Sequence, residues 1–262
     1  MATMNGIAPG RFCWVELGTS DQAAAKAFYS GLFGWTPDDQ PMGPEFFYTL
    51  LKHGGRDAGA LYGLMPDQKG VPPHWMIYVA VASADDTAEK AASLGARTIM
   101  APYDVMDLGR TAIFEDPTGA PFSVWEARRN KGLGVVDEAG AFCWGELSTK
   151  DPRKAEPFYR GLFGWGTQGD PKGPYTEWTQ GGQPIGGMMK IAPEWGDMPP
   201  HWGVYFQVND CDAAVAQAKG LGAKAMVEPK DIPGTGRFAV LADPQGASFS
   251  LVTLTGPSPD HS

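Results

Sequence analysis

The chain contains two copies of one sequence pattern, and this duplication constrains its fold more than any other feature. Residues 12–17 read FCWVEL and residues 142–147 read FCWGEL, while residues 28–35 read FYSGLFGW and residues 158–165 read FYRGLFGW. These blocks recur 130 residues apart, whereas PHW (73–75 and 200–202) and DPTGA/DPQGA (116–120 and 243–247) recur 127 residues apart. Solenoid repeats are much shorter, about 20–50 residues. The pattern therefore indicates a duplicated domain.

The length of the chain fits this duplication. A chain of 262 residues has room for two domains, each large enough to bury its own core. We expect an N-terminal domain over residues 1–128, a glycine-rich linker over 129–140 and a C-terminal domain over 141–255. Residues 256–262 are expected to form a disordered tail.

The charge balance restricts the partners. The formal net charge is −9 and no basic cluster interrupts it, so neither nucleic acid nor an anionic membrane is an expected partner. The chain has no signal-peptide pattern and no apolar run long enough to span a bilayer. The three cysteines are too few for a disulfide framework. We therefore expect a cytoplasmic protein with a small-molecule ligand, as a monomer or a homodimer.

Helix and strand signals alternate in the same order in each copy. Asp21 is a good N-cap for a helix that runs to about Ser30 and ends at Gly31. The second copy keeps the cap as Asp151, and Pro157 is expected to bend or shorten its helix. Each domain reads as strand, helix and three strands, written twice. The predicted fold class is α+β, with four βαβββ modules.

The order of these motifs resembles the vicinal oxygen chelate superfamily, which includes glyoxalase I, extradiol dioxygenases and bleomycin-resistance proteins. The resemblance depends on the opening strand, the Phe-Tyr…Leu-Phe-Gly-Trp helix, the Leu-Gly-Ala helix end and the Asp-Pro-x-Gly-Ala turn, and it covers nearly the whole chain twice. It is nearest to tandem, glyoxalase-like bacterial proteins. It implies two glyoxalase-like domains with curved mixed sheets, each curling into a cup that holds the ligand.

The resemblance also implies where a divalent metal would be bound. The positions that carry His, Gln or Glu ligands in the family correspond by register to Trp14, Met76 and Ser123 in the first copy. In the second copy they correspond to Trp144, Gly203 and Ser250. In neither copy do these three side chains make a suitable ligand set for a divalent ion. We therefore predict no metal site and no cofactor.

Polar and aromatic residues that recur in both copies are the candidate site. Strand side chains alternate between two faces, so residues two apart share a face. The predicted ligand-binding residues are Trp14, Tyr78, Arg110, Ser123 and Trp125 in the first copy, and Trp144, Tyr205, Arg237 and Ser250 in the second. If a reaction occurs, the predicted acid–base residues are Glu16, His74, Glu146 and His201. Such a cup suits a small aromatic or anionic ligand, which the arginines would orient.

Three alternatives stay open from the sequence. The first is a metal-independent binder that resembles the bleomycin-resistance branch. The second is a glyoxalase-like lyase or isomerase, or a dioxygenase-related enzyme, that uses Glu/His acid–base chemistry or a relocated divalent metal. The third is a pure interaction protein whose cups are filled. For the residues themselves a structural role also stays open, in which Glu16 and Arg110 form a buried ion pair that only orders the fold. The sequence also leaves open whether Glu16 shares a cup with His74 or with His201.

Overall fold

The computed structural model describes residues 7–44, 46–68, 70–169 and 173–256. Each copy of the repeat forms one eight-stranded mixed sheet, with the strand orders β2-β3-β4-β1-β5-β8-β7-β6 and β10-β11-β12-β9-β13-β16-β15-β14. The predicted α+β class with βαβββ modules is confirmed. The predicted tail falls almost entirely outside the described residues.

The element bounds follow the duplicated pattern closely. The first copy contains β1 (Phe12–Thr19), α1 (Gln22–Phe33), β2 (Thr36–Pro41), β3 (Phe47–His53), β4 (Arg56–Gly63), β5 (His74–Ala80), α2 (Ala84–Ser93), β6 (Arg97–Val105), β7 (Gly109–Glu115) and β8 (Pro121–Ala127). The second contains β9 (Phe142–Thr149), α3 (Pro152–Phe163), β10 (Gly166–Gln168), β11 (Tyr175–Gln180), β12 (Gln183–Lys190), β13 (His201–Gln207), α4 (Cys211–Gly220), β14 (Lys224–Ile232), β15 (Gly236–Ala242) and β16 (Ser248–Leu254).

The ends of the first helix show which signals decide local structure. Asp21 caps α1 as predicted, because its side chain accepts a hydrogen bond from the Ala24 amide at 2.9 Å. The predicted end at Gly31 is wrong: α1 continues to Phe33 and ends at Gly34, which is left-handed with φ 70°. Gly31 instead lies within the helix, where a β-carbon would stand 3.1 Å from Leu221, the residue that caps the C-terminal end of α4. A glycine at this position therefore allows α1 to pack closely against the end of α4.

Pro157 does not shorten its helix. Both α1 and α3 have 12 residues, although α3 contains Pro157 in its interior. Among the described residues, none of the four helices has both the length and the apolar character needed to cross a bilayer.

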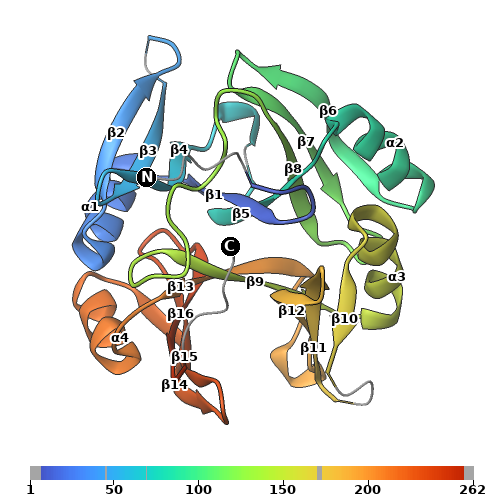
Figure 1. Ribbon diagram of the computed structural model, residues 1–262. Helices are drawn as coiled ribbons and strands as arrows, with labels where there is room; N and C mark the ends of the chain where they lie inside the picture. Colours follow the sequence, from blue (N-terminus) through green and yellow to red (C-terminus); the bar gives the residue numbers. More distant parts are fainter. Residues whose placement is uncertain (1–6, 45, 69, 170–172, 257–262) are drawn as a thin grey trace. The chain divides into compact units, whose positions relative to one another are not determined.

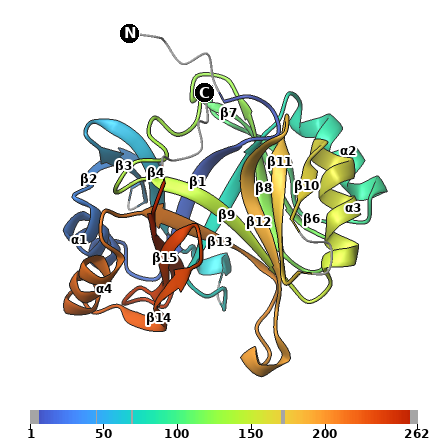
Figure 2. The ribbon, with the colours of Figure 1, turned by 60° about the horizontal axis from the view of Figure 1, so that its bottom comes forward.

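Packing divides the chain differently from the sequence repeat. Unit 1 comprises the described residues within Met1–Trp14, Met76–Gly132 and Trp144–Gly203, and unit 2 those within Val15–Trp75, Leu133–Cys143 and Val204–Ser262. Each unit therefore takes parts of both repeats. In both views α1 of the first repeat lies beside α4 of the second, and α2 lies beside α3 (Figures 1 and 2). The domain boundaries predicted from the repeat stay a prediction.

An aromatic cluster fills the core of unit 2. Phe33 and Trp35 of the first repeat pack against Phe206 of the second with ring centroids 5.1 and 5.4 Å apart. The hydroxyl of Tyr29 accepts a hydrogen bond from Trp75 Nε1 at 3.0 Å and donates one to the Asp243 carboxylate at 3.0 Å. Burial raises the pKa of Tyr29, and the nearby Asp243 carboxylate raises it further. This chain of two hydrogen bonds, called the Trp–Tyr–Asp relay below, joins the two repeats.

Unit 1 repeats the relay with the roles of the repeats exchanged. Tyr159 accepts from Trp202 Nε1 at 2.8 Å and donates to Asp116 at 2.8 Å. The Asp116 carboxylate also accepts from the amides of Thr118 and Ala120 in its own turn. The Asp-Pro-x-Gly-Ala motif therefore forms the predicted tight turn and also anchors a helix from the other repeat.

Candidate functional site

Strand register places Glu16 on the face of its strands that points away from α1. Glu16 lies opposite Ala60 in the parallel β1–β4 pair, and Tyr48 lies opposite Tyr62 in the antiparallel β3–β4 pair. Directly opposite residues share a face. The other face carries Leu17 and Thr49, and the Thr49 hydroxyl accepts a hydrogen bond from Gln22 of α1 at 2.9 Å. Glu16, Gly18, Tyr48 and Tyr62, with His74, are called the Glu16 face below.

Two contacts organise the Glu16 face. The Tyr48 hydroxyl donates to Glu16 Oε2 at 2.7 Å, a charge-assisted hydrogen bond that fixes the carboxylate. A β-carbon on Gly18 would stand 3.1 Å from the Tyr62 hydroxyl and 3.3 Å from His74 Cε1. Gly18 therefore lets Tyr62 and His74 lie close together beside β1. Gly18 is two residues from Glu16 on the same strand face, so this contact brings His74 of the same repeat beside the Glu16 face, and all of these residues lie in unit 2.

The histidine ring is held by the backbone just before β5. His74 Nδ1 lies 2.9 Å from the Pro72 carbonyl oxygen, and His201 Nδ1 lies 2.9 Å from that of Pro199. The sequence indicated that His74 lies at a strand start, and β5 begins at this residue. Both histidine side chains are half-buried.

The second repeat builds a related face in unit 1. Glu146 lies opposite Gly187, Ser148 lies opposite Met189, and Tyr175 lies opposite Met189 from the other side. Here the Tyr175 hydroxyl accepts a hydrogen bond from Trp144 Nε1 at 2.9 Å. These residues with His201, namely Glu146, Ser148, Tyr175, Met189 and His201, are called the Glu146 face.

A second group of predicted residues shares one face of the β5–β8–β7 strands in unit 1. Tyr78 lies opposite Ser123, and Trp125 lies opposite Thr111. Ser123 is fully buried, and its hydroxyl has no hydrogen-bond partner among the described residues. The indole of Trp125 donates to the Asn130 carbonyl at 2.9 Å. In unit 2 Tyr205 lies opposite Ser250 in the same way.

The two predicted arginines lie on the other face of their strands. Arg110 is opposite Glu126, whereas Ser123 is opposite Ile113, so Arg110 and Ser123 point to opposite sides of the sheet. Arg237 is opposite Thr253 and Ser250 is opposite Val240, which gives the same result in the second repeat. The prediction that Arg110 and Arg237 share a face with the serines is wrong. The alternation of side chains within β7 and β15 was assigned correctly. The error was in deciding which of their two faces is shared with Ser123 of β8 and Ser250 of β16.

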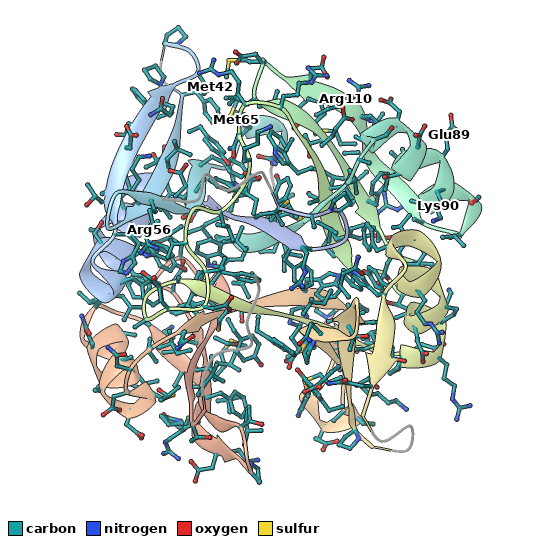
Figure 3. All side chains as sticks on the ribbon, in the orientation of Figure 1. Met42, Arg56, Met65, Glu89, Lys90 and Arg110 are labelled. Atoms are coloured by element: carbon teal, nitrogen blue, oxygen red, sulfur yellow. The ribbon has the colours of Figure 1, made fainter. Side chains whose placement is uncertain are left out.

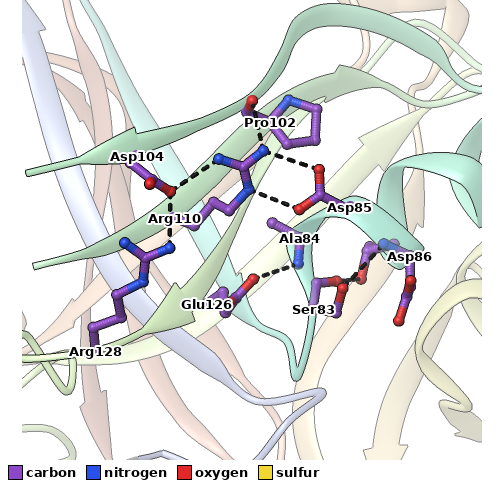
Figure 4. Close-up of polar contacts among 10 residues, drawn as sticks. Ser83, Ala84, Asp85, Asp86, Pro102, Asp104, Arg110, Glu126 and Arg128 are labelled. Atoms are coloured by element: carbon purple, nitrogen blue, oxygen red, sulfur yellow. Dashed lines mark hydrogen bonds and ion pairs between the residues drawn. The ribbon is translucent and has the colours of Figure 1, made fainter. Parts of the chain in front are cut away.

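Both arginines are bound by aspartates of the helix-bearing side. Arg110 makes a bidentate ion pair with Asp85 in the first turn of α2, at 2.7 and 2.9 Å, and a further contact with Asp104 at 2.9 Å (Figure 4). In Figure 3 Arg110 lies toward α2, the helix that carries Glu89 and Lys90. Hydrogen bonds from Arg110 lower the pKa of Asp85 and of Asp104. The ion pairs of Arg110 are therefore with Asp85 and Asp104, and the predicted alternative of an ion pair with Glu16 is wrong.

The same arrangement recurs in unit 2. Arg237 forms a bidentate pair with Asp212 of α4 at 2.6 and 3.0 Å and contacts Asp231 at 2.8 Å. Recurrence in both copies was the reason for selecting these arginines. The structure shows that the recurrent element is a surface ion-pair network between a helix start and a strand.

The residues at the family's metal positions do not fit a divalent cation. Trp14, Met76 and Ser123 offer an indole, a thioether and a neutral hydroxyl, where hard cations take carboxylates or imidazoles. Within the described part of the chain, His, Cys, Asp and Glu form no group of three or more that could hold a metal ion. Trp14 is 5% exposed and Met76 is 9% exposed, so both are packed side chains.

Sequence reasoning missed Tyr48, Tyr175, Tyr62 and Gly18. Tyr48-Thr49 recurs as Tyr175-Thr176 with the 127-residue offset of the neighbouring blocks, so recurrence could have found the first two. Tyr62 is replaced by Met189 and Gly18 by Ser148, so the repeat carries no signal for them. Only their pairing with Glu16 and His74 in space reveals them.

Two tandem sheets with these strand orders and cross-repeat helix pairs define a glyoxalase-like class of protein. Residues 11–124 match the glyoxalase/bleomycin resistance protein/dioxygenase superfamily, and residues 145–252 match the glyoxalase-like domain. The chain belongs to this superfamily, with one such domain in each repeat. The predicted family is confirmed.

Similar proteins are found in Mycobacterium and Streptomyces. The chain is 40% identical over 244 residues to CFP32 of Mycobacterium tuberculosis, provisionally named a glyoxylase, covering 91% of this chain and 93% of that protein. It is 37% identical over 265 residues to the anthracycline biosynthesis protein DnrV of Streptomyces peucetius, covering 96% of each. The Mn(II)-bound glyoxalase from Novosphingobium aromaticivorans has a TM-score of 0.67 at 16% identity, covering 94% of this chain and 82% of that one. That likeness shows the shared fold.

Proposed function

We propose that this protein binds a small aromatic molecule without a metal ion, on the faces of its sheets that point away from the helices. The observation that carries the proposal is the donor set: Trp14, Met76 and Ser123 occupy the positions where the resemblance puts cation ligands. Aromatic walls with a few polar groups are typical of small-molecule sites. The Glu16 and Glu146 faces supply those polar groups.

The arginine positions change the expected chemistry of the ligand. An anionic ligand was expected because Arg110 and Arg237 were assigned to the binding face. Both guanidiniums lie on the other face and bind aspartates. The Glu16 carboxylate would also repel an anion. We therefore propose a neutral or hydrogen-bond-donating aromatic ligand, with no role for either arginine.

The relatives are consistent with an aromatic ligand. DnrV is named for anthracycline biosynthesis, and an anthracycline is a fused-ring aromatic compound. Acid–base catalysis through Glu16 and His74 stays a prediction, and the same variants that test binding also test it.

Metal content and co-purified ligand test the proposal together. Elemental analysis of the purified full-length protein is expected to give far less than one equivalent of zinc, iron or manganese. Native mass spectrometry is expected to find an organic molecule that stays bound after EDTA treatment. The fraction of protein that carries this molecule is expected to be lower for the Glu16→Gln variant. Stoichiometric metal that EDTA removes together with the ligand would overturn the proposal. The Asp86→Asn variant, at an exposed helix position, is the matched control.

A further inference from the structure

The hydrogen-bonding state of His74 follows from its contact with Pro72. A carbonyl oxygen has only lone pairs, so the ring nitrogen 2.9 Å from the Pro72 oxygen must carry the hydrogen. In a neutral imidazole the other nitrogen then holds a lone pair. Nε2 of neutral His74 is therefore a hydrogen-bond acceptor.

The sequence builds this arrangement twice. Pro-Pro-His occurs at residues 72–74 and again at 199–201, with the same 2.9 Å contact in each unit. Proline restricts φ to about −65°, so two successive prolines limit where the first carbonyl can point. The histidine ring is thus fixed by rigid backbone on its Nδ1 side.

His74 lies beside the Glu16 face: its Cε1, the ring atom bonded to Nε2, is 3.3 Å from where a Gly18 β-carbon would stand. His74 is half-buried, and Nε2 has no hydrogen-bond partner among the described residues. The ring lies beside Gly18, whose missing side chain leaves it room next to the Tyr62 hydroxyl. A buried or half-buried acceptor favours a ligand that supplies the missing donor.

We propose that His74 Nε2 accepts a hydrogen bond from the ligand, so that the Glu16 face selects molecules presenting a hydroxyl or N–H group. This inference rests on the proposed function, because it requires that the face binds a small molecule. The Glu146 face has Ser148 and Met189 in place of Gly18 and Tyr62. It therefore offers fewer tyrosine hydroxyl groups than the Glu16 face and selects a different ligand or binds the same one less tightly.

The tautomer is tested first, on the full-length protein with ¹⁵N-labelled histidine. The chain has four histidines, and single His→Gln variants assign their signals. Long-range ¹H–¹⁵N correlation at alkaline pH is expected to show His74 and His201 protonated at Nδ1 and unprotonated at Nε2. Protonation of His74 at Nε2 would overturn the inference.

Ligand selection is tested with 2-naphthol and its methyl ether, 2-methoxynaphthalene, which has no hydroxyl donor. We expect 2-naphthol to shift the His74 Nε2 signal and to bind about tenfold more tightly than the ether. His74→Phe should bring the two affinities within about twofold, since the acceptor is lost. His74→Gln, whose amide oxygen accepts, should restore part of the preference, and Asp86→Asn, at an exposed helix position, should leave it intact.

The outcomes separate this inference from the proposed function. If both naphthalenes bind the Glu16 face equally tightly, the binding site stands and the role of His74 is wrong. If neither compound perturbs His74, the inference fails, whereas the proposed function fails only if the metal and co-purified-ligand tests contradict it. Thermal unfolding of each variant confirms that it is folded.

Discussion

The helix-side cores of the two units are alike, whereas the faces that carry the glutamates differ. Trp75–Tyr29–Asp243 in unit 2 and Trp202–Tyr159–Asp116 in unit 1 make the same pair of hydrogen bonds. On the open faces, Gly18 and Tyr62 of the first repeat correspond to Ser148 and Met189 of the second. Duplication has preserved the packing that joins the repeats and let the candidate sites diverge. The copies therefore are one scaffold with two different surfaces.

The largest expected effect tests whether the cores are equivalent. Asp116→Ala removes the acceptor for Tyr159 and for two turn amides, and Asp243→Ala does the same for Tyr29. Each should lower the free energy of unfolding by about 3 kcal/mol, because buried donors lose their partner. Urea denaturation measures both. A cost in only one unit would contradict the equivalence.

Two buried tryptophans sharpen the comparison inside unit 1. Trp165 Nε1 donates to the Gly10 carbonyl at 2.7 Å, while Trp178 Nε1 has no partner among the described residues. Trp165→Phe should therefore destabilise the protein by about 1–2 kcal/mol more than Trp178→Phe. Trp35→Phe, which loses the equivalent bond to Gly140, is the unit 2 control. Equal losses for Trp165→Phe and Trp178→Phe would show that the hydrogen bond contributes little.

The pH dependence of stability should reveal the buried Asp243. Burial raises the pKa of its carboxyl, so the folded state holds the proton more tightly than the unfolded state. The stability it contributes is fully present below the ordinary aspartate pKa, about 3.9, and is lost as the pH rises through the raised value. Relative to Asp243→Asn, the wild type should lose stability with rising pH above about 4. Urea titrations at constant ionic strength would show a flat difference if the argument is wrong.

A smaller change should make one face resemble the other. Gly18→Ser gives the first repeat the residue found at Ser148, and its β-carbon would press on side-chain ends of Leu64, Tyr62 and His74. We expect a stability cost of about 1 kcal/mol, a shift of the His74 NMR signals and weaker 2-naphthol binding. Ser148→Gly is the reverse control. Unchanged binding in Gly18→Ser would separate Gly18 from the site.

The smallest effect is expected at the surface arginines. Arg110→Gln breaks exposed ion pairs with Asp85 and Asp104, so it should change the melting temperature slightly, and less at high salt. Ligand affinity should not change. A clear loss of affinity in Arg110→Gln, with Arg237→Gln unaffected, would return Arg110 to the candidate site.

The fold was predictable from local signals, but the pairing of faces was only partly so. Caps such as Asp21 and the Asp-Pro-x-Gly-Ala turns set element order, and recurrence selected Glu16 and His74. The phase of β7 was wrong because alternation within one strand does not say which face is which. Counting back from the Asp116 turn, which pairs Glu115 with Pro121, would have placed Arg110 opposite Glu126.

The packing of helices from different repeats, α1 beside α4 and α2 beside α3, could not be predicted. Gly31 signals a helix end by composition, and only the approach of Leu221 from the other repeat explains its position inside α1. Tyr62 and Gly18 have no counterpart in the second repeat, so a comparison of copies passes over them. Contacts between residues so far apart in sequence leave no local pattern to read.

The hydrogen bond between Tyr29 and Asp243 spans 214 positions of the chain. A ribosome that has released the first repeat alone has not yet made the strands and helix that complete the core of unit 2, so this core closes only near the end of synthesis. Long-range closure of this kind slows folding. A nascent chain halted inside the second repeat would expose Phe33 and Trp35 to chaperones and proteases.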